Sequence, residues 1–288
     1  MFLTTKRLVR RYYSEIGVKE WRRLVRDPYH RLEFETTMHF FKKHSPFEGL
    51  VLDDGGGHGR YTIELAKLGY DVVLLDLTPE LLEIARKQTK KARVEDRVKQ
   101  VLQGSIDDLS VFDSNTFDVV LCLGGTLSHI VNGKRREKAI DELVRVAKKN
   151  APIFVSVIGR LATLVCALIY WPEEMENDGL YQKICDTVDY YGGRGIYTRW
   201  YTGKKRSFAP CHFHLREELE ESFRKRNVKI LEMVGLEGLA TLHQKETNRL
   251  FKKYPKAWKN WQEIHLKTCT CSSVVDASQH FMIICKKY

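Results

Sequence analysis

The sequence lacks the cysteine pattern of a disulfide-stabilised or zinc-binding protein. Its seven cysteines are an odd number scattered along the chain, which is typical of proteins from a reducing compartment. Cys269 and Cys271 have no second pair at zinc-ligand spacing. Cys211, His212 and His214 offer ligand-type side chains, but adjacent positions of an extended chain point to opposite sides. We therefore expect no metal site, and we expect a cytoplasmic location.

Long hydrophobic runs are also missing. Residues 1–13 contain four basic residues with no apolar run behind them, so the sequence does not predict a signal peptide. The most hydrophobic stretch, 151–171, is interrupted by a proline, a glycine and an arginine. We expect a strand at 152–158 and an apolar helix at 161–171 there, rather than a membrane span.

Positive charge is in excess, but it is not concentrated. The chain has 48 Lys and Arg against 37 Asp and Glu, a net charge of +11. Such a surplus suits an anionic partner such as nucleic acid. The basic residues are spread over predicted helices, for example at 87–91 and 134–138, where solvated helix faces account for most of them. Nucleic-acid binding therefore stays open as an alternative rather than as the leading interpretation.

What the chain does contain is a regular alternation of β-prone and amphipathic segments. This alternation predicts an α/β protein with a doubly wound, mostly parallel sheet. With 43% apolar residues, the 288-residue chain can bury a large core. The expected strands are 49–53, 72–76, 98–102, 118–123, 152–158, 228–236 and 279–285, and the expected helices are 61–68, 80–91, 133–149, 215–226 and 243–266.

Residues 51–60, Val-Leu-Asp-Asp-Gly-Gly-Gly-His-Gly-Arg, combine a strand end, an acid and a glycine turn that leads into a helix. Glycine permits positive φ angles and lets a ligand approach the backbone closely. The helix N-terminus after such a turn is a usual site for a nucleotide-like cofactor. Asp76 ends the next strand 17 residues after Gly59, at about the distance where a carboxylate binds ribose hydroxyls.

Two common nucleotide-binding sequences are absent at this turn. A dinucleotide fingerprint requires a glycine at its sixth position, but the frames that start at Gly55 and Gly57 place Arg60 and Thr62 there. No Gly-Lys-Ser or Gly-Lys-Thr follows, so a Walker loop is excluded. The turn therefore indicates a different kind of cofactor site.

The pattern D-x-G-x-G-x-G that starts at Asp53, followed by Asp76, resembles the class I S-adenosylmethionine-dependent methyltransferases. The resemblance covers residues 45–158 well and 215–288 more loosely. It implies a seven-stranded Rossmann-like sheet with an antiparallel last strand, and S-adenosyl-L-methionine as the cofactor. The residues that it places around the cofactor are Asp53, Gly55, Gly57, Gly59, Asp76, Leu77, Ser105, Ile106, Asp107, Leu123 and Gly124.

One position departs from the family pattern. In the family, residues after the third strand hold the adenine, and an aspartate usually follows the glycine there. This chain has Gly104 followed by Ser105. We expect Ser105 or Asp107 to substitute for the missing acid, and the backbone at Ile106 to contribute.

The resemblance also suggests how the chain is divided. The regular rhythm of strands and helices stops over 160–214, where aromatic residues alternate with glycines. A lid of this kind favours a small organic acceptor, which Tyr13, Tyr197 and Tyr201 are predicted to contact. The expected divisions are an N-terminal helical cap at 1–45, a cofactor-binding core at 46–159, a substrate lid at 160–214 and the completion of the core sheet at 215–288.

Methyl transfer from a sulfonium is an in-line displacement, so an enzyme must align the acceptor, exclude water and in some cases remove a proton. A neutral imidazole titrates in the right range for such a proton. His129 follows the fourth strand, in the loop expected to face the methyl group, and His212 follows the lid. Both are predicted catalytic residues, and a structural or cofactor-positioning role for His129 stays equally open.

The leading hypothesis is a methyltransferase for a small molecule. No Asn-Pro-Pro-Tyr or Asp-Pro-Pro-Tyr sequence follows the fourth strand, and that sequence marks many enzymes that methylate nucleic-acid bases or protein glutamine. Two alternatives remain. One is an RNA methyltransferase that uses the basic surface, and the other is a cofactor-binding partner subunit without catalytic activity. The oligomeric state and the acceptor atom stay open.

Overall fold

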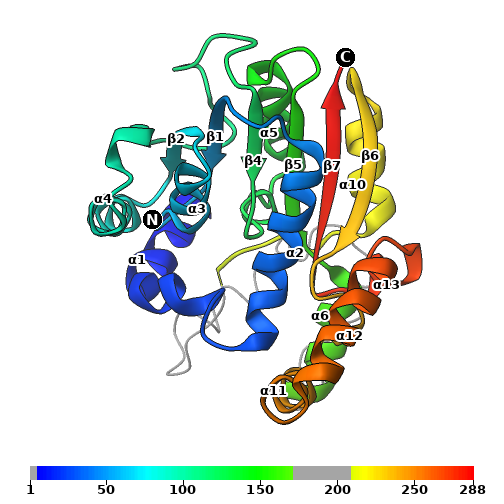
Figure 1. The fold of residues 1–288 in the computed structure, drawn as a ribbon. Coiled ribbons are helices and arrows are strands. Elements are labelled where there is room, and N and C mark those ends of the chain that lie inside the picture. The colour runs from blue at the N-terminus through cyan, green and yellow to red at the C-terminus, as the bar shows by residue number, and fades with distance from the viewer. Residues whose placement is uncertain (1–4, 171–208) are drawn as a thin grey trace.

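The computed structural model describes residues 5–170 and 209–288, which form a seven-stranded sheet with helices on both faces (Figure 1). The strand order across the sheet is β3-β2-β1-β4-β5-β7-β6. The strands are β1 (Leu50–Asp54), β2 (Asp71–Asp76), β3 (Val98–Gln103), β4 (Val119–Cys122), β5 (Pro152–Ile158), β6 (Val228–Gly235) and β7 (His280–Lys287).

Helices fill most of the segments between the strands, and short turns of 3₁₀ helix lie among them. The α-helices are α1 (Thr5–Arg23), α2 (Pro28–His44), α3 (Arg60–Lys67), α4 (Pro79–Ala92), α5 (Gly133–Val146), α6 (Arg160–Tyr170), α10 (Arg216–Arg224), α11 (Gln244–Lys253), α12 (Pro255–Thr268) and α13 (Ser272–Ala277).

The first five strands are parallel, and the sheet reverses its direction of growth at β1. This strand pairs with both β2 and β4, so that Leu52 lies opposite Val73 on one side and Val120 on the other. β7 lies antiparallel between β5 and β6. The predicted seven-stranded Rossmann-like sheet with an antiparallel last strand is therefore confirmed. In open α/β sheets, the carboxyl ends of the strands beside such a reversal are where ligands bind.

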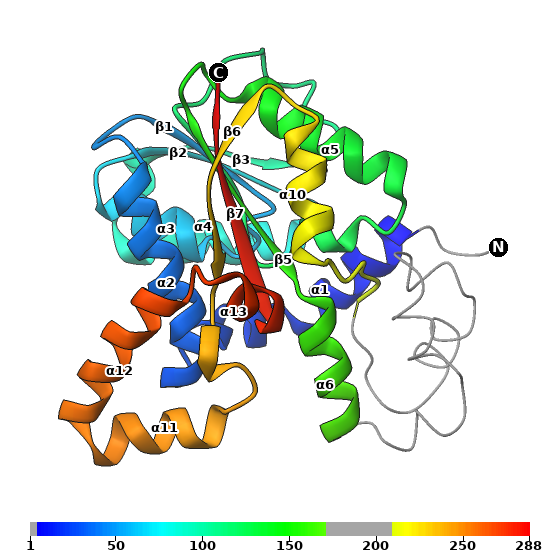
Figure 2. The same cartoon turned by 90° about the vertical axis from the view of Figure 1, so that its right-hand side faces the viewer.

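Alternate side chains of each strand enter two apolar cores on opposite faces of the sheet. Leu52 and Val120 face α5 and α10 in one core. Val51 and Val119 face α2 and α3 in the other core. Figure 2 shows these two helical layers on either side of the strands. Near-continuous apolar strands such as β5, which is buried along its whole length, are the expected consequence of coverage on both faces.

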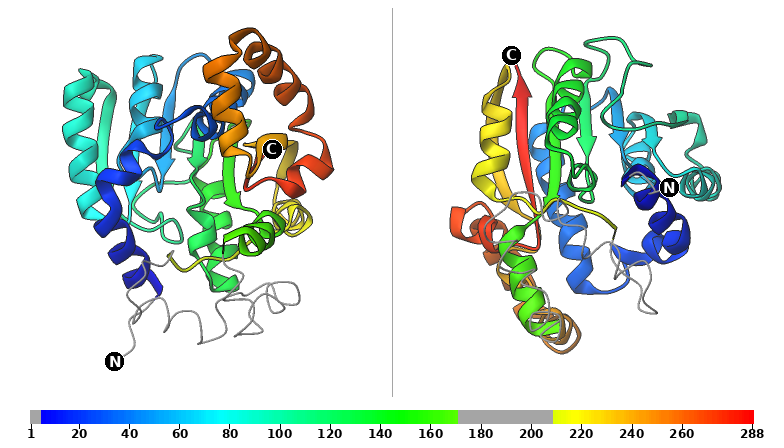
Figure 3. Two further views of the ribbon diagram at one scale, coloured as in Figure 1. Left: turned by 90° about the horizontal axis from the view of Figure 1, so that it is seen from below. Right: turned by 180° about the vertical axis from the view of Figure 1, so that it is seen from behind.

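The segment predicted as an N-terminal cap contains α1 and α2, and the name cap is kept for these two helices. Asp27 caps α2 by accepting a hydrogen bond from the backbone N–H of His30, and Pro28 occupies the first turn, where its missing N–H costs nothing. α2 packs on the sheet, whereas α1 lies alongside α4 at the lower end of the strands in Figure 1 (Figure 3). The cap therefore lies next to the carboxyl ends of β1 and β2.

Two expectations about helices need correction. The predicted helix 243–266 is two helices, α11 and α12, because Pro255 has no N–H and disfavours a helical conformation at the preceding residue. The predicted helix 133–149 ends three residues early, because Ala147 forms a bridge with Phe117 and the chain turns into extended structure. Thr78 occupies the N-cap position of α4, but its side chain makes no capping hydrogen bond.

The predicted lid lies mostly outside the described residues. Its described ends are α6 and residues 209–214. None of the helices in the described ranges combines the length and the apolar character that crossing a bilayer requires.

Candidate active site

A cavity opens at the carboxyl ends of β1, β2 and β4, and α1 forms one of its walls. Nine of the eleven predicted cofactor residues line it. The two others, Gly59 and Asp107, stand behind the lining. The predicted residues on the wall are Asp53, Gly55, Gly57, Asp76, Leu77, Ser105, Ile106, Leu123 and Gly124.

The glycine turn brings two loops into direct contact. Gly55 has a φ of +78°, and a Cβ atom there would lie 2.3 Å from the Cγ2 atom of Thr126 in the loop after β4. Thr126 also donates a hydrogen bond to the carbonyl oxygen of Gly55 at 3.3 Å. A side chain at this position would therefore separate the two loops that form the floor of the cavity.

Asp53 is buried and anchors the start of α3. Its Oδ2 atom accepts hydrogen bonds from the backbone N–H and the hydroxyl of Thr62, at 3.1 and 2.6 Å. Its Oδ1 atom has no hydrogen-bond partner within the described ranges. Burial raises the pKa of Asp53 to about 6, even though the Thr62 hydrogen bonds lower it. One oxygen of this buried carboxyl group is thus left without a partner among the described residues.

Asp76 holds the turn and the next helix together. Its Oδ2 atom accepts from the N–H of Gly57 at 3.0 Å, and its Oδ1 atom accepts from the N–H of Thr78 at 2.7 Å. Each carboxylate oxygen has a second lone pair, so Asp76 can still accept from ribose hydroxyls. Burial raises the pKa of Asp76 to about 6. The position and the remaining acceptor capacity both fit the predicted ribose contact.

Asp107 supports the cavity wall from behind. It accepts a hydrogen bond from the hydroxyl of Ser105 at 2.5 Å, and it pairs with Lys6 of α1 at 2.9 Å and with Arg135 of α5 at 2.5 Å. Burial raises the pKa of Asp107, but Ser105, Lys6 and Arg135 outweigh it and bring the pKa down to about 2. Asp107 therefore joins the part of the cavity wall formed by Ser105 to α1 and α5.

Gly59 serves the packing of helices. It is the N-cap of α3 with a φ of +79°, and a Cβ atom there would lie 3.2 Å from the Cβ of Ala85 in α4. Gly59 lies behind the cavity wall and does not line the cavity. Its lack of a side chain lets α3 and α4 pack closely.

Tyr13 and His129 form a hydrogen-bonded pair across the cavity. The Nδ1 atom of His129 lies 2.7 Å from the carbonyl oxygen of Pro210, and its Nε2 atom lies 2.7 Å from the hydroxyl of Tyr13. A carbonyl oxygen can only accept, so Nδ1 carries the proton. Burial lowers the pKa of His129 to about 4, which leaves the ring neutral near pH 7. Its Nε2 atom therefore accepts the proton of the Tyr13 hydroxyl.

The other predicted acceptor-side residues are placed differently. His212 is buried but does not line the cavity, and its backbone N–H donates to the carbonyl of Ser128 at 2.6 Å. Its ring stacks edge-on against His214 at 4.5 Å between centroids. This placement indicates packing beneath the loop after β4. Tyr197 and Tyr201 lie outside the described residues.

Sequence reasoning missed three charged residues of α1 that line the cavity, Lys6, Glu20 and Arg23. The Nε atom of Arg23 donates to Glu20 at 2.6 Å, and its two terminal nitrogens pair with Glu33 of α2. A three-residue spacing on a basic, aromatic helix was the only signal in the sequence, and it is indistinguishable from an ordinary surface ion pair.

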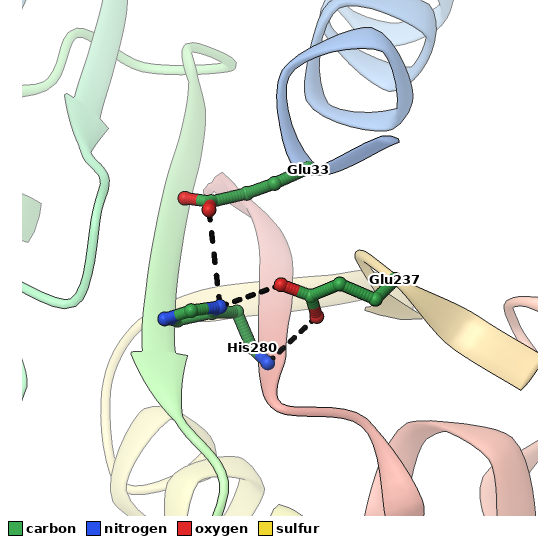
Figure 4. Close-up of side chains that lie close together, drawn as sticks. All are labelled: Glu33, Glu237 and His280. Atoms are coloured by element: carbon green, nitrogen blue, oxygen red, sulfur yellow. Dashed lines mark hydrogen bonds and ion pairs between the residues drawn. The ribbon is translucent and has the colours of Figure 1, made fainter. Parts of the chain in front are cut away.

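Behind Arg23, a buried charge cluster joins the cap to the far strands (Figure 4). The Nδ1 atom of His280 lies 2.6 Å from Glu237 and 3.8 Å from Glu33. Burial lowers the pKa of His280, but the two carboxylates outweigh it and raise the pKa above its ordinary value. These three residues could surround a metal ion by distance alone. Arg23 pairs with Glu33, and both carboxylates favour the charged form of His280, so ion pairs within the described residues account for the placement of these three side chains.

The fold and the site together define a Rossmann-like protein with a cavity at the carboxyl ends of its parallel strands. Residues 51–150 match the family model described as a methyltransferase domain. A glycine/sarcosine N-methyltransferase of Parasynechococcus marenigrum is 32% identical over 140 residues, which are 48% of each chain. A ubiquinone biosynthesis O-methyltransferase of Xanthomonas axonopodis pv. citri is 31% identical over 115 residues, which are 40% of this chain and 45% of that protein.

Among solved structures, a SAM-dependent methyltransferase from Methanosarcina mazei has the same fold, with a TM-score of 0.55 at 19% identity over 86% of this chain and 96% of that chain. The chain spans about half the length of the curated relatives it matches. Residues 51–150 are therefore similar to a methyltransferase domain, which agrees with the resemblance of the sequence to the class I S-adenosylmethionine-dependent methyltransferase family. This family implies S-adenosylmethionine as the cofactor, in agreement with the sequence prediction.

Proposed function

We propose that the protein transfers the methyl group of S-adenosylmethionine to a small organic molecule. The observation that carries the proposal is the cavity itself. The glycine turn, the carboxyl groups of Asp53 and Asp76, and the Tyr13–His129 pair all line this one cavity. When bound, the cofactor supplies an already activated methyl group, so the chain needs to bind, orient and shield rather than to generate an electrophile.

The strand ends are suited to hold the cofactor. Asp76 offers acceptors for ribose hydroxyls, and Ser105 and Ile106 line the expected adenine side. Leu123 and Gly124 border the opposite end of the cavity, below the cap. Gly124 has a φ of +67°, which exposes its backbone to the cavity without a side chain.

The Tyr13–His129 pair is suited to orient an acceptor. Because Tyr13 gives its only proton to His129, its oxygen presents lone pairs to the cavity and accepts a hydrogen bond from an N–H or O–H group. Burial raises the pKa of Tyr13 well above its ordinary value and lowers that of His129. The proton thus stays on Tyr13, which favours a positioning role for His129 over the role of a general base.

The printed names of the two curated relatives point to small acceptors, an amino acid in one case and a ubiquinone precursor in the other. Together with the partly apolar cavity and the Tyr13 acceptor atom, they support a small molecule with an N–H or O–H group. We keep both acceptor atoms open in the proposal.

The first experiment measures binding of S-adenosylhomocysteine to the full chain by calorimetry, followed by transfer of labelled methyl groups to a panel that includes glycine, sarcosine, polyprenylated phenols and tRNA. Turnover of one small acceptor supports the proposal. Failure to bind S-adenosylhomocysteine would sink it. Binding without turnover, even with cell extract, would favour the cofactor-binding partner subunit instead.

The same assay tests the pair. Tyr13→Phe keeps the ring but removes the hydroxyl, so we expect kcat to fall about tenfold to a hundredfold while the affinity for S-adenosylhomocysteine is unchanged. Tyr12→Phe is the matched control, because Tyr12 neighbours Tyr13 on α1 but does not line the cavity.

A second candidate, RNA methylation, is favoured by one observation. Helices α11 and α12 carry seven basic and two acidic residues between Gln244 and Thr268, and all seven basic side chains are exposed. Figure 2 shows the two helices projecting from the lower end of the molecule. Affinity for tRNA that falls steeply with salt, and that is lost in a Lys252→Glu, Lys253→Glu variant, would support this candidate. Affinity no stronger than for random polyanions would dismiss it.

A further inference from the structure

Two helical segments begin at the same edge of the sheet as the cavity. The cavity lies at the carboxyl ends of β1, β2 and β4. β5 is parallel to β4, and β6 runs in the same direction as β5, because both are antiparallel to β7. α6 follows β5, and α11 and α12 follow β6. The cavity, α6 and the α11–α12 pair therefore share one edge, the lower end of the molecule in Figures 1 and 2, which we call the carboxyl edge.

The turn between α11 and α12 is strongly basic. Residues 249–259 contain five Lys and Arg but neither Asp nor Glu, and residues 251–257 are exposed throughout. Two aromatic residues stand among these cations, Phe251 with 41% and Tyr254 with 49% of their surface exposed. Lysines beside exposed aromatic rings are typical of segments that lie at the surface of an anionic membrane.

The inner side of the α11–α12 pair is fixed to the cap. Asn248 accepts a hydrogen bond from the backbone N–H of Tyr29 at 3.0 Å, and Gln244 donates to Asp27 at 2.9 Å. A small apolar core shared with α2 lies on the same side. The pair is thus held in place from one side, and the basic turn faces solvent in a defined position.

α6 adds an aliphatic face at the carboxyl edge. Leu161, Val165 and Leu168 follow the i, i+4, i+7 spacing of one helix face, and all three are exposed, as is Ile169 beside them. Ala162, on the other side of the helix, is buried. Four exposed aliphatic side chains on a single helix form a patch rather than isolated surface residues, and such a patch indicates contact with an apolar partner.

The two features together distinguish between anionic partners. A nucleic acid binds lysines through its phosphates and stacks its bases on aromatic rings, but it leaves an aliphatic helix face in water. A bilayer that contains anionic lipids attracts the lysines through its surface charge and takes up aliphatic and aromatic side chains at its interface. The combination at the carboxyl edge therefore fits a bilayer better than a nucleic acid.

We propose that the carboxyl edge docks on an anionic membrane surface, with the basic turn among the lipid headgroups and the aliphatic face of α6 in the interface. The helices lie on the bilayer and do not cross it. The cavity opens at this edge, so docking brings it next to the bilayer. Docking requires neither a cofactor nor methyl transfer, so the proposal stands or falls independently of the proposed function.

Co-sedimentation of the full chain with lipid vesicles tests the docking. The vesicles contain phosphatidylcholine alone or with about 30% phosphatidylglycerol, at low and at high salt. The charge variant combines Lys252→Glu with Lys253→Glu in the basic turn. Its control combines Lys149→Glu with Lys286→Glu, which makes the same charge change at exposed positions near the amino end of β5, at the opposite edge of the sheet.

A second variant tests the aliphatic face. Leu168→Gln replaces an exposed side chain of α6 with a polar one of similar size. Val111→Gln is the matched control, because Val111 has the same exposure, 66%, in the segment between β3 and β4. Because all the altered positions are exposed, each variant should unfold at the same temperature as the wild type, which a thermal scan checks.

We expect the wild type to bind the anionic vesicles at least about tenfold more tightly than the neutral ones, and more tightly at low salt than at high salt. The charge variant should lose at least about tenfold in affinity for the anionic vesicles, and Leu168→Gln about threefold or more. Both controls should stay within about twofold of the wild type.

Three results would overturn the proposal. The first is no binding to vesicles, or equal binding to both kinds. The second is a loss in the Lys149→Glu, Lys286→Glu control as large as that in the charge variant, which would show that only net charge matters. The third is unaltered binding by either test variant. If Leu168→Gln binds as before and tRNA displaces the vesicles, the basic turn belongs to a nucleic-acid site instead.

Discussion

The two walls of the cavity differ in how their residues are held. The strand-end wall, formed by the loops after β1, β2, β3 and β4, is fixed by backbone groups. Gly57 and Thr78 donate to Asp76, and Thr62 donates to Asp53. The cap wall, formed by α1, is fixed by side-chain ion pairs. Arg23 pairs with Glu33, and Lys6 pairs with Asp107.

This difference has a physical consequence. Backbone donors come with the fold, so a carboxylate at a strand end is held wherever the strand–turn–helix unit forms. An ion pair between helices exists only after both helices have docked, and its partners can come from distant parts of the chain. The strand-end wall therefore depends on local structure, whereas the cap wall depends on the docking of α1 and α2.

The largest effect should follow from removing Asp76, which breaks the strand-end wall. Asp76→Ala deletes the proposed ribose acceptor and leaves the N–H groups of Gly57 and Thr78 without their partner. We expect the affinity for S-adenosylhomocysteine to fall about a hundredfold or more, measured by calorimetry. Asp71→Ala is the control, because Asp71 lies at the opposite end of the same strand and pairs with surface cations. Full affinity in a folded Asp76→Ala protein would contradict the assignment.

The same contrast explains what the sequence could predict. The strand-end residues lie within one or two positions of an apolar strand. A sequence motif that locates the strand end therefore also locates the cavity wall. Nine of the eleven predicted cofactor residues line the cavity for this reason. The remaining two, Gly59 and Asp107, lie near the cavity but do not line it. Gly59 packs against α4 and Asp107 forms ion pairs, and both contacts exist only in the assembled structure.

The cap residues could not be predicted in the same way. Glu33, Glu237 and His280 are far apart in the sequence and meet only because α2 packs beside β6 and β7. No local pattern distinguishes them from solvated charges. Tyr13 was singled out as an aromatic residue of the cap, but its hydrogen bond to His129 spans 116 positions of the chain and has no local signature.

A second contrast lies within the strand-end wall itself. Asp53 and Asp54 are neighbours on β1 and therefore point to opposite faces of the sheet. Asp53 lines the cavity, whereas Asp54 is fully buried, and neither of its oxygens has a hydrogen-bond partner in the described ranges. Burial, with the charge of Asp53 next, raises the pKa of Asp54 well above its ordinary value. Folding thus favours the protonated form of Asp54.

Asp54→Leu should therefore stabilise the protein by about 2 kcal/mol at pH 7. A carboxyl whose pKa is raised by folding stabilises fully only below its unfolded pKa, and stability is lost as the pH rises toward the folded value. The gain should be largest at neutral and higher pH and should shrink below about pH 4. Urea unfolding at several pH values measures it, with Asp71→Leu as the exposed counterpart. A loss of stability at pH 7 would contradict the expectation that the buried carboxyl group of Asp54 destabilises the fold.

A smaller effect should appear in the pH dependence of cofactor binding. Burial raises the pKa of both Asp53 and Asp76 to about 6, and their ionised forms are the better acceptors. The affinity for S-adenosylhomocysteine should be constant above about pH 7. Below about pH 6 it should fall about tenfold per unit for each carboxyl that must lose its proton. Calorimetry from pH 5 to pH 8 measures this slope. Asp76→Asn should make this slope shallower. An unaltered slope would show that the protonation of Asp76 does not affect cofactor binding.

The smallest effect on cofactor affinity should come from breaking the ion pair between Lys6 and Asp107, which joins the two walls. Lys6 pairs with Asp107 at 2.9 Å, but its side chain is 39% exposed, and such partly exposed pairs contribute less than about 1 kcal/mol. Asp107 also keeps its bonds to Ser105 and Arg135 when Lys6 is removed. Lys6→Met should therefore weaken S-adenosylhomocysteine only a few-fold, about twofold to fivefold, and more at low salt than at high salt, because exposed charges are screened. Lys19→Met, an exposed change elsewhere on α1, should have no effect. A loss of affinity as large as that from Asp76→Ala would show that the position of α1 depends on this one ion pair. The proposed difference between the two walls would then be wrong.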